Sequence, residues 1–539
     1  MPSSAISFDQ TTFHNSFVDE LPGEATMNNE PRQMPGVLYS RVQPTTVAAP
    51  RLLAWSGELA AELGLSRPPA AQGPAVDLLA GNAVAATMKP FAARYGGHQF
   101  GNWAGQLGDG RAMSLGELTA PDGRSWEIQL KGAGPTPYSR RADGRAVLRS
   151  SLREFLCSEA MHDLGVPTTR ALSLVATGDQ IVRDMFYSGN PQLEPGAVVA
   201  RVAPTFVRFG SFQLLAAAGE IDNLRQLADY VIRHHFPELG APSPAVYAAW
   251  FQEVCRRTAL MAAHWQAVGF VHGVMNTDNM SILGLTIDYG PYGWLEPYEP
   301  DWTPNTTDFG GRRYAYAQQP RIARWNLAML GHALTPLLNT PDGVAALNAG
   351  LDLYNATFAQ THDTQLAAKL GLTLAADISP DDRALLNELP EALEAAEADM
   401  TLFFRRLSHL APALLADPAD EENLFWELLD AVSYAAPGTG GARLLPWLSR
   451  YARRLRQETR PAAIIQAQML AANPKYVLRN YLAQQAIEAA EAGDLSVLER
   501  LMAVLKTPFA EQPEHEELAA RRPEWARDKA GCSTLSCSS

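Results

Sequence analysis

Cysteine, long apolar runs and clusters of basic residues are all scarce in this sequence. Four cysteines among 539 residues are too few for a scaffold held together by disulfide bonds. No stretch approaches the roughly 20 uninterrupted apolar residues that a membrane-spanning helix needs. No run of Lys or Arg occurs, and a net charge of −14 does not suit a duplex-binding protein, which presents a basic stripe. We therefore expect neither a membrane protein nor a nucleic-acid-binding protein.

The beginning of the chain also has few basic residues. Residues 1–20 include three acidic side chains and no Lys or Arg, so they match neither a secretory signal nor an Arg-rich transit peptide. We accordingly expect a cytoplasmic protein. The length and a hydrophobic share of 47% are sufficient for one very large domain or two packed lobes. The sequence leaves the oligomeric state open, and a monomer is the simplest expectation.

The first hundred residues combine turn-rich, helical and glycine-rich segments. Residues 1–45 are turn-rich and predict an extended arm on the surface. Leu52–Leu63 has the apolar spacing of a helix, which Gly64 would end. Residues 95–111 contain six glycines, and each glycine inside a helix costs about 0.5–1 kcal/mol relative to alanine. This stretch therefore predicts loops whose backbone closely approaches another group.

Short strands and one helix are predicted next. A turn at 120–123 joins strands at 112–118 and 125–131, and the second strand alternates so that Lys131 lies opposite its apolar face. The further elements predicted are a helix at 145–164, a strand pair on either side of 178–179, and a strand at 198–202.

Ala/Leu-rich helical segments dominate after about residue 210. The helices predicted there span 245–268, 322–338, 384–410 and 461–471, and the one β-like interruption spans 269–290. This order predicts an α+β protein with a smaller β-containing N-lobe and a large, mostly helical C-lobe. The boundaries that we expect are an arm at 1–45, an N-lobe with nucleotide-binding loops at 46–210, a C-lobe with a catalytic loop and a metal site at 211–510, and a mobile tail at 511–539.

Two features of the N-lobe are typical of nucleotide sites, but each has an ordinary structural alternative. Gly108-Asp109-Gly110 before a strand would let backbone N–H groups cradle phosphates, or it is only a tight turn. Lys131 at a strand end and Glu154 in the next helix resemble the kinase pair in which a helix glutamate holds a strand lysine over the nucleotide phosphates. The alternative is two solvated surface charges.

Residues 270–283 match a kinase catalytic loop much more specifically. Such loops carry a histidine, an aspartate base two residues later, and a metal-binding asparagine five residues after that aspartate. His272 and Asn279 have this spacing, and Asp288-Tyr-Gly matches the metal-binding Asp-Phe-Gly element. Asn279 and Asp288 offer the oxygen ligands that suit Mg²⁺. The segment therefore predicts a kinase-like fold with a magnesium site.

The departure from the kinase pattern is equally informative. Val274 stands where kinases have their catalytic aspartate, and a valine side chain cannot accept a proton. Either the site is inactive or another group is the base. Asp278, next to Asn279, is the obvious replacement, and an acidic turn cap is its structural alternative.

Arg201 and Arg208 lie seven residues apart after a predicted strand. Two guanidinium groups at this spacing would clamp a triphosphate. Salt bridges between the two lobes are an equally good explanation of the pair.

Longer strings around these motifs are similar to the selenoprotein O family, also called the YdiU family, of protein adenylyltransferases. The strings that carry the resemblance are Ala93–Trp103, Gly108–Arg111, Gln129–Arg140, Ala142–Arg145, His272–Asn279, Asp288–Gly290 and the terminal Cys-Ser-Ser. The resemblance covers the chain from about residue 10 to its end. It implies a pseudokinase fold that binds ATP in a flipped orientation and transfers AMP to Ser, Thr or Tyr hydroxyls of proteins, its own included.

The resemblance also implies roles for individual residues. Those expected to line the nucleotide are Gly108, Gly110, Arg111, Lys131, Asp143, Gly144, Arg201, Arg208 and Asp288. Glu154 would pair with Lys131, and Asp278 would accept the proton of the attacking hydroxyl. Asn279 and Asp288 would bind Mg²⁺. Some members also use Mn²⁺ and transfer UMP, so both stay open for this chain, and its implied partners are ATP and proteins that bear hydroxyl groups.

The cysteines depart from the family pattern. In some bacterial members a cysteine in the loop after the Asp-Tyr-Gly element pairs with a tail cysteine, whereas residues 291–309 contain none here. A redox role for the tail thiols Cys532 and Cys537, through a bond between them or to a substrate protein, stays open, and so does an inert tail.

Two alternative functions belong to other classes. A catalytically inactive, ATP-binding pseudokinase scaffold would have no need to keep both Asn279 and Asp288. A true phosphotransferase would need a base where Val274 stands. The sequence therefore favours AMP transfer.

Overall fold

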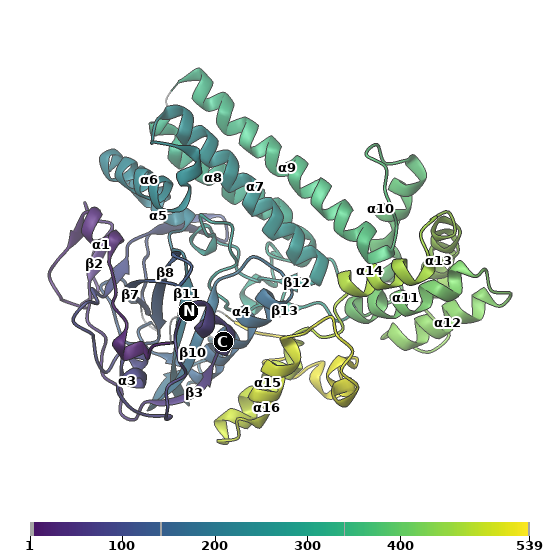
Figure 1. Cartoon of the computed structure of the whole chain (residues 1–539), viewed down its shortest axis with the longest axis horizontal. Coiled ribbons are helices and arrows are strands. Elements are labelled where there is room, and N and C mark those ends of the chain that lie inside the picture. The colour runs from purple at the N-terminus through teal and green to yellow at the C-terminus, as the bar shows by residue number, and fades with distance from the viewer. Residues whose placement is uncertain (1–4, 141–142, 339, 537–539) are drawn as a thin grey trace.

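The computed structural model describes residues 5–140, 143–338 and 340–536. A β-sheet forms the core of the N-terminal part, and the rest of the chain is almost entirely helical (Figure 1). Three long helices, α7 (Pro244–Val268), α8 (Gln319–Leu334) and α9 (Pro341–Leu370), pack against one another beside the sheet-containing part. The predicted α+β class with a smaller β-containing lobe and a large helical lobe is confirmed.

A nine-stranded sheet runs through the smaller lobe, antiparallel except where its first two strands pair. Its order is β1-β2-β4-β7-β8-β11-β10-β3, and β9 pairs with β11. The strands are β1 (Gly23–Glu24), β2 (Tyr39–Arg41), β3 (Arg51–Trp55), β4 (Phe91–Ala93), β7 (Ala112–Thr119), β8 (Ser125–Lys131), β9 (Ala146–Val147), β10 (Arg170–Arg183) and β11 (Gln192–Ala203). The central strands are buried on both faces, so the sheet can hold side chains rigidly at their ends.

The predicted hairpin at 112–131 is confirmed as β7 and β8. The helix predicted at Leu52–Leu63 is wrong in its first half, because Arg51–Trp55 form β3, which pairs with β10. Only Gly57–Glu62 form a helix, α2. Ser56 separates the two elements, since its hydroxyl accepts the N–H of Leu59 at 3.4 Å and caps α2.

Two further boundaries differ from the prediction. The strand pair expected around 178–179 is the single strand β10, in which a bulge between Ala176 and Gln180 accommodates the turn-like residues. The helix predicted at 145–164 begins later, as α4 (Leu148–Asp163), because β9 first pairs with β11.

The helical lobe contains the predicted helices with one correction. Segment 384–410 was predicted as one helix, but Asp399 caps a new helix there by accepting the N–H of Leu402 at 3.0 Å. The remaining helices are α5 (Phe209–Ala217), α6 (Ile221–His235), α10 (Pro380–Ala395), α11 (Met400–Leu415), α12 (Glu421–Val432), α13 (Gly441–Leu455), α14 (Ala462–Ala472), α15 (Asn480–Glu491) and α16 (Ser496–Leu505), and α1 (Ser16–Glu20) and α3 (Pro74–Ala80) belong to the smaller lobe.

The N-terminal segment, residues 5–45, is mostly exposed or half-buried, but several of its side chains reach the core. Phe8, Phe13 and Phe17 are buried, and the Phe17 ring stacks on Phe91 with 5.0 Å between ring centres. Strands β1 and β2 extend the main sheet. Aromatic residues in a turn-rich segment thus anchor it to the lobe.

The C-terminal segment is packed as well, so the expected mobile tail is wrong for the described residues. Leu535 is buried, and its N–H donates to the carbonyl of Pro304 at 2.8 Å while its carbonyl accepts the N–H of Thr306 at 2.8 Å. Cys532 is 1% exposed, and burial raises the pKa of its thiol to about 11, which opposes reactivity. Cys537 lies outside the described residues, so the redox role of the pair stays a prediction.

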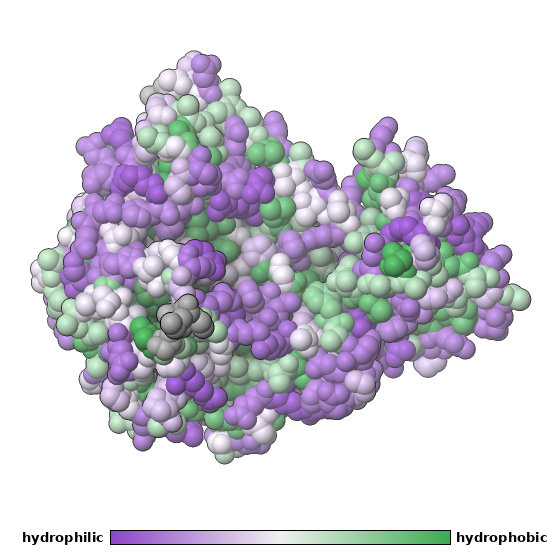
Figure 2. Space-filling model, viewed as in Figure 1, coloured by the Kyte–Doolittle hydropathy of each residue, from purple (hydrophilic) through white to green (hydrophobic). Residues whose placement is uncertain are grey.

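The surface is mainly hydrophilic on the face shown in Figure 2, with hydrophobic residues scattered among polar ones. Within the described residues the apolar side chains gather in three buried clusters, one on each face of the sheet and one among α10 to α14. Among all the residues that the structure describes, no helix is both long enough and apolar enough to cross a membrane.

A buried ion pair connects α11 to the segment that leads into α15. Arg479 donates to the two carboxylate oxygens of Asp399 at 2.8 and 3.1 Å, and the side chains are 1% and 0% exposed. We expect Arg479→Met to lower the free energy of unfolding by about 3–5 kcal/mol, because it leaves the Asp399 charge buried without its partner. Denaturation in urea measures the change.

The matched control is Arg443→Met. Arg443 and its partner Glu391 are 62% and 68% exposed. Removing this pair should therefore lower the free energy of unfolding by less than about 1 kcal/mol. Equal losses in the two variants would show that the Arg479–Asp399 pair is not a special contributor to stability.

Candidate active site

The sheet and the loop at 272–290 enclose a cavity of about 770 Å³, a typical volume for a small-molecule site. The predicted site residues that line it are Gly108, Gly110, Arg111, Lys131, Asp143, Arg201, Asp278, Asn279 and Asp288. Glu154 and Arg208 contact these lining residues from behind, and Gly144 is outside the lining. The structure thus brings together residues from both lobes that are up to 180 positions apart in the chain.

Lys131 and Glu154 form an ion pair, so the alternative of two solvated surface charges is wrong. Lys131 ends β8, and its Nζ lies 2.6 Å from Glu154 Oε2 on α4. The Glu154 side chain is 2% exposed, and its other oxygen accepts from Arg201 Nη1 at 3.1 Å. Burial lowers the pKa of Lys131, and the neighbouring Glu154 carboxylate opposes this shift. The lysine is therefore held at the cavity wall by a fixed carboxylate.

Asp288 lies between two arginines. Arg201 Nη1 is 2.5 Å from Asp288 Oδ1, Arg208 contacts Oδ2, and the two arginine side chains are 3% and 2% exposed. Burial alone would raise the pKa of Asp288, but the guanidinium groups of Arg208 and Arg201 hold it well below its usual range. The φ angle of Asp288 is +56°, a left-handed conformation that aspartate tolerates better than most residues. Both arginines thus form the salt bridges between the lobes that the sequence left open, and they do so at the cavity: Arg201 lines it, and Arg208 holds Asp288 from behind.

His272 fixes the loop that carries the metal-ligand candidates. Its ring is buried beside Trp265, with 5.4 Å between ring centres, and its Nε2 lies 2.9 Å from the Ile287 carbonyl. This contact joins the catalytic loop to the residue before Asp288. Asn279 Nδ2 donates to the Val274 carbonyl at 2.9 Å, so the amide oxygen of Asn279 is left for another partner.

Asp278 is a buried carboxylate at the cavity with one free oxygen. Gln99 Nε2 donates to Asp278 Oδ2 at 3.2 Å, whereas Oδ1 is buried and has no hydrogen-bond partner among the described residues. Burial raises the pKa of Asp278 to about 6. Gly97 fits against this carboxylate so closely that a Cβ there would lie 2.4 Å from Oδ1. Asp278 therefore has the position and the free lone pairs that a proton acceptor needs.

The loop at 108–110 packs tightly at the rim of the cavity. Gly108 has a φ of +134°, and a Cβ there would lie 2.5 Å from the Tyr138 ring. A Cβ on Gly110 would lie 2.6 Å from Asp143 Oδ2, and Arg111 Nη2 is 3.0 Å from Asp143 Oδ1. These glycines are thus needed for contacts within the protein, and a role of their N–H groups in holding phosphates stays a prediction.

Sequence reasoning missed three polar residues of the site. Asp109 is 3% exposed and lies 3.8 Å from Arg208 Nη2, Gln129 accepts a hydrogen bond from Arg201, and Gln99 holds Asp278. The sequence contained a signal for two of them, Gln129 and Asp109. Gln129 precedes Lys131 by two residues and so shares its strand face, and Asp109 lies between the two glycines.

The residues fit a cation that shares its coordination with a nucleotide. Among the described residues, no group of three or more His, Cys, Asp and Glu side chains could hold a metal ion. Mg²⁺ commonly takes one or two carboxylates together with phosphate oxygens and water. The free amide oxygen of Asn279 and the Asp288 carboxylate are suitable oxygen ligands.

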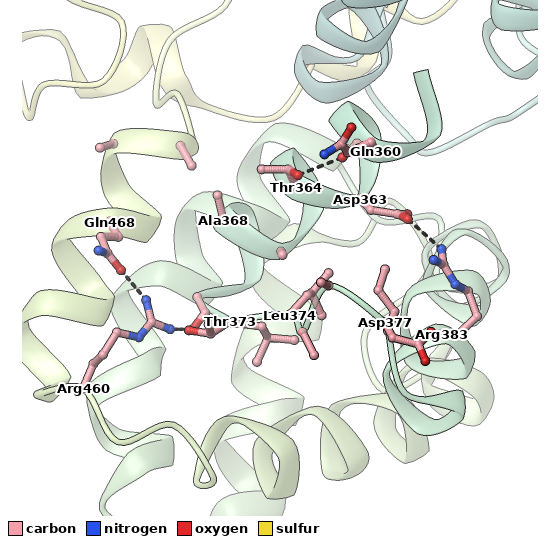
Figure 3. A pocket seen from close by; sticks show the side chains of 18 residues that line it. Gln360, Asp363, Thr364, Ala368, Thr373, Leu374, Asp377, Arg383, Arg460 and Gln468 are labelled. Atoms are coloured by element: carbon pink, nitrogen blue, oxygen red, sulfur yellow. Dashed lines mark hydrogen bonds and ion pairs between the residues drawn. The ribbon is translucent and has the colours of Figure 1, made fainter. Parts of the chain in front are cut away.

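A larger cavity, of about 1140 Å³, lies in the helical lobe between the end of α9, the loop at 371–378 and α14 (Figure 3). Both of its arginines and one of its two aspartates are already paired. Arg383 lies 2.8 Å from Asp363, and Arg460 bonds to the Gly371 carbonyl at 2.7 Å. Perturbed carboxylates and clustered cations mark the smaller cavity as the candidate active site despite its volume.

Comparisons with known proteins agree with this geometry. Residues 25–506 match the family model described as protein adenylyltransferase SelO. Proteins named protein nucleotidyltransferase YdiU are similar over almost their whole length: that of Nitrosospira multiformis is 58% identical (98% of this chain, 96% of the relative), and that of Azoarcus sp. is 56% identical (98% and 99%). The protein of the same name from Xanthomonas axonopodis pv. citri is also 56% identical, with the same coverage. The suspected resemblance is confirmed, and the chain belongs to the protein adenylyltransferase SelO family.

Proposed function

We propose that this enzyme transfers the AMP moiety of ATP to Ser, Thr or Tyr hydroxyls of proteins, including its own, with the help of Mg²⁺. The observation that carries the proposal is the position of Asp278. Asp278 lines the same cavity as Lys131, Arg201 and Asp288, and its Oδ1 has no hydrogen-bond partner among the described residues, while Val274 offers no base at the kinase position. A phosphate-binding site that keeps its metal-ligand candidates but has its proton acceptor elsewhere favours reaction at a different phosphorus atom.

The charges of the cluster support a role for a divalent cation. Three cations, Lys131, Arg201 and Arg208, are already balanced by the carboxylates of Glu154 and Asp288, with Asp109 close by. A triphosphate would add several negative charges to this buried site, and two positive charges of Mg²⁺ would offset part of them. When bound, the ion would also polarise the phosphate under attack. Asn279 and Asp288 are the residues that would hold it.

The reaction is a displacement at the α-phosphorus. The protein hydroxyl oxygen forms a bond to the α-phosphorus, the bond between this phosphorus and the bridging oxygen to the β-phosphate breaks, and pyrophosphate leaves. Asp278 takes the hydroxyl proton on its carboxylate, which lines the cavity. Lys131, Arg201 and Arg208 stabilise the negative charge of the polyphosphate, and their partners Glu154 and Asp288 keep these cations in place. The same chemistry would transfer UMP from UTP, with Mn²⁺ in place of Mg²⁺.

The phosphate that becomes attached to protein tests the proposal. With Mg²⁺ and ATP labelled at the α-phosphate, the chain itself should become labelled, and γ-labelled ATP should leave it unlabelled. We expect Asp278→Asn to slow this labelling by about 10²–10⁴-fold, the usual effect of losing a general base. Asp301→Asn, a change of the same kind at an exposed position, is the matched control and should label at the normal rate.

Two results would assign the protein to a functional class other than the nucleotidyltransferases. Label from γ-labelled ATP alone would make it a phosphotransferase. Nucleotide binding without label from either substrate would make it a scaffold.

Gly97 offers a second test, because the fit of the glycine-rich stretch against Asp278 is specific. In Gly97→Ala the new methyl group would lie 2.4 Å from Asp278 Oδ1 and must displace the carboxylate. We expect the rate of AMP transfer to fall by at least about tenfold, as misplacement of a catalytic group by about 1 Å does. Rates of α-label incorporation with saturating ATP measure the effect.

Gly57→Ala is the control for this variant. Nothing lies within 4 Å of a Cβ at Gly57, in α2, so this change should leave the rate as it is. A Gly97→Ala enzyme with an unchanged rate would place Asp278 outside the reaction.

A further inference from the structure

The glycine-rich stretch forms a small hairpin of its own over the active site. Strand β5 (Gly96–Gln99) and strand β6 (Asn102–Gln106) make a two-stranded sheet that is separate from the main sheet. A two-residue turn, Phe100-Gly101, joins them, and both turn residues have positive φ angles of +50° and +85°. Phe100 and Gln99 line the active-site cavity. The tip of the hairpin therefore lies at the cavity.

The β5 side of the hairpin is bonded to the catalytic loop. The His98 N–H donates to Thr277 Oγ1 at 2.7 Å, and the Phe100 N–H donates to Asn276 Oδ1 at 3.2 Å. Gln99 holds Asp278, as described above. These bonds fix the hairpin relative to the proton acceptor, so a group that docks on the hairpin is positioned relative to Asp278 as well.

The β6 side of the hairpin is exposed. In the described parts of the chain β6 pairs only with β5, so its outer edge lies beside no other strand. Its first three residues, Asn102, Trp103 and Ala104, are exposed, and Trp103 presents 40% of its surface to solvent. Such an edge is a template for an added strand, because its outward N–H and C=O groups can pair with another extended segment.

Aromatic and cationic side chains lie beside the hairpin, around the cross-strand pair His98 and Trp103 and near the turn residue Gly101. The His98 ring is 5.1 Å from Trp103 and 5.5 Å from Trp325 between ring centres. The Arg313 guanidinium lies 4.7 Å from the centre of the Trp325 ring. Its Nε is buried without a hydrogen-bond partner among the described residues. Trp and Arg are the residues most often found at the energetic centres of protein interfaces.

We propose that the outer edge of β6 is the docking site for the protein substrate, which adds an extended segment as a third strand of the hairpin and places an acidic side chain at Arg313. The inference rests on the proposed transfer to protein hydroxyls, and it names how that substrate is recognised. Backbone pairing accepts many sequences, and Arg313 selects among them by charge. The occupant must be a polypeptide, because a nucleotide has no backbone that matches a strand edge.

The geometry of strand addition suits delivery to Asp278. An added strand would lie about 4.8 Å beyond β6 and run parallel to its axis. A chain that continues past the turn at Phe100-Gly101 arrives at the cavity, which Phe100 lines. The hydroxyl that reacts is therefore expected just outside the paired segment, on the residue that passes the hairpin tip.

Peptides with a modified backbone test the pairing directly. The probe is a synthetic peptide with an extended segment of about six residues, Thr, Val and Glu in alternation, followed by a serine. Two variants carry N-methyl groups on alternate residues, one set on each edge of the extended segment. One set should lower kcat/KM for AMP transfer to serine by at least about tenfold, because it removes the hydrogen bonds to β6, and the other set should be tolerated. Equal rates for the two sets would overturn the proposal.

Charge selection is tested by Arg313→Glu in the full-length enzyme. We expect the ratio of kcat/KM for the Glu-containing peptide to that for the same peptide with Lys in place of Glu to fall by about tenfold in this variant. The matched control is Arg406→Glu on α11, an exposed arginine with the same change of charge, which should leave the ratio unchanged. A ratio that does not respond to Arg313→Glu, or that responds equally to both variants, would remove Arg313 from substrate selection.

Self-labelling in the absence of peptide distinguishes a failure of the docking proposal from a failure of the proposed function. If the enzyme labels itself with AMP but modifies neither peptide, or modifies both N-methylated sets equally, strand addition on β6 is wrong and nucleotidyl transfer stands. If α-labelled ATP labels neither the enzyme nor a peptide, the proposed function fails, and the docking proposal fails with it.

Discussion

The Asp288 carboxylate, held between Arg201 and Arg208, is the interaction on which the rest of the site depends. The two arginine side chains are 3% and 2% exposed and the Asp288 side chain 20%, and a buried charge without a partner costs several kcal/mol, so the three groups must be positioned together. Arg201 comes from the end of β11 and also contacts Glu154, which holds Lys131. Arg208 also donates to the Asp278 carbonyl at 2.9 Å. One carboxylate thereby connects Lys131, through Arg201 and Glu154, with Asp278, through Arg208.

The same cluster explains why a kinase-like framework can support a different reaction. The lysine, its helix glutamate and the asparagine and aspartate of the metal pattern meet at one cavity, and in the proposed reaction the base is Asp278 instead of the residue at position 274. That replacement depends on Gly97, because any side chain there would collide with Asp278. The glycine-rich hairpin therefore fixes the surroundings of Asp278, although it carries little side-chain chemistry of its own.

The sequence predicted which residues meet at the cavity more accurately than it predicted the segment boundaries, and the reason is physical. Alternation along β8 placed Lys131 on the face away from the apolar residues because side chains in a strand alternate with a period of two. Leu52–Trp55 and the tail around Leu535 were assigned wrongly because distant partners decide their structure: β10 pairs with the first, and Pro304 and Thr306 bind the second. The hydrogen bond from Gln99 to Asp278 joins residues 179 positions apart, and no local sequence pattern indicates it. Local patterns thus fix faces and motifs, whereas long-range pairing fixes boundaries and contacts.

The identity of the small product tests the central claim most directly. When the enzyme modifies a protein in the presence of ATP and Mg²⁺, ³¹P NMR distinguishes pyrophosphate from ADP in the same sample. Displacement at the α-phosphorus with Asp278 as the proton acceptor predicts one pyrophosphate released for each modified hydroxyl. Release of ADP in that ratio would instead show attack at the γ-phosphorus and contradict the account.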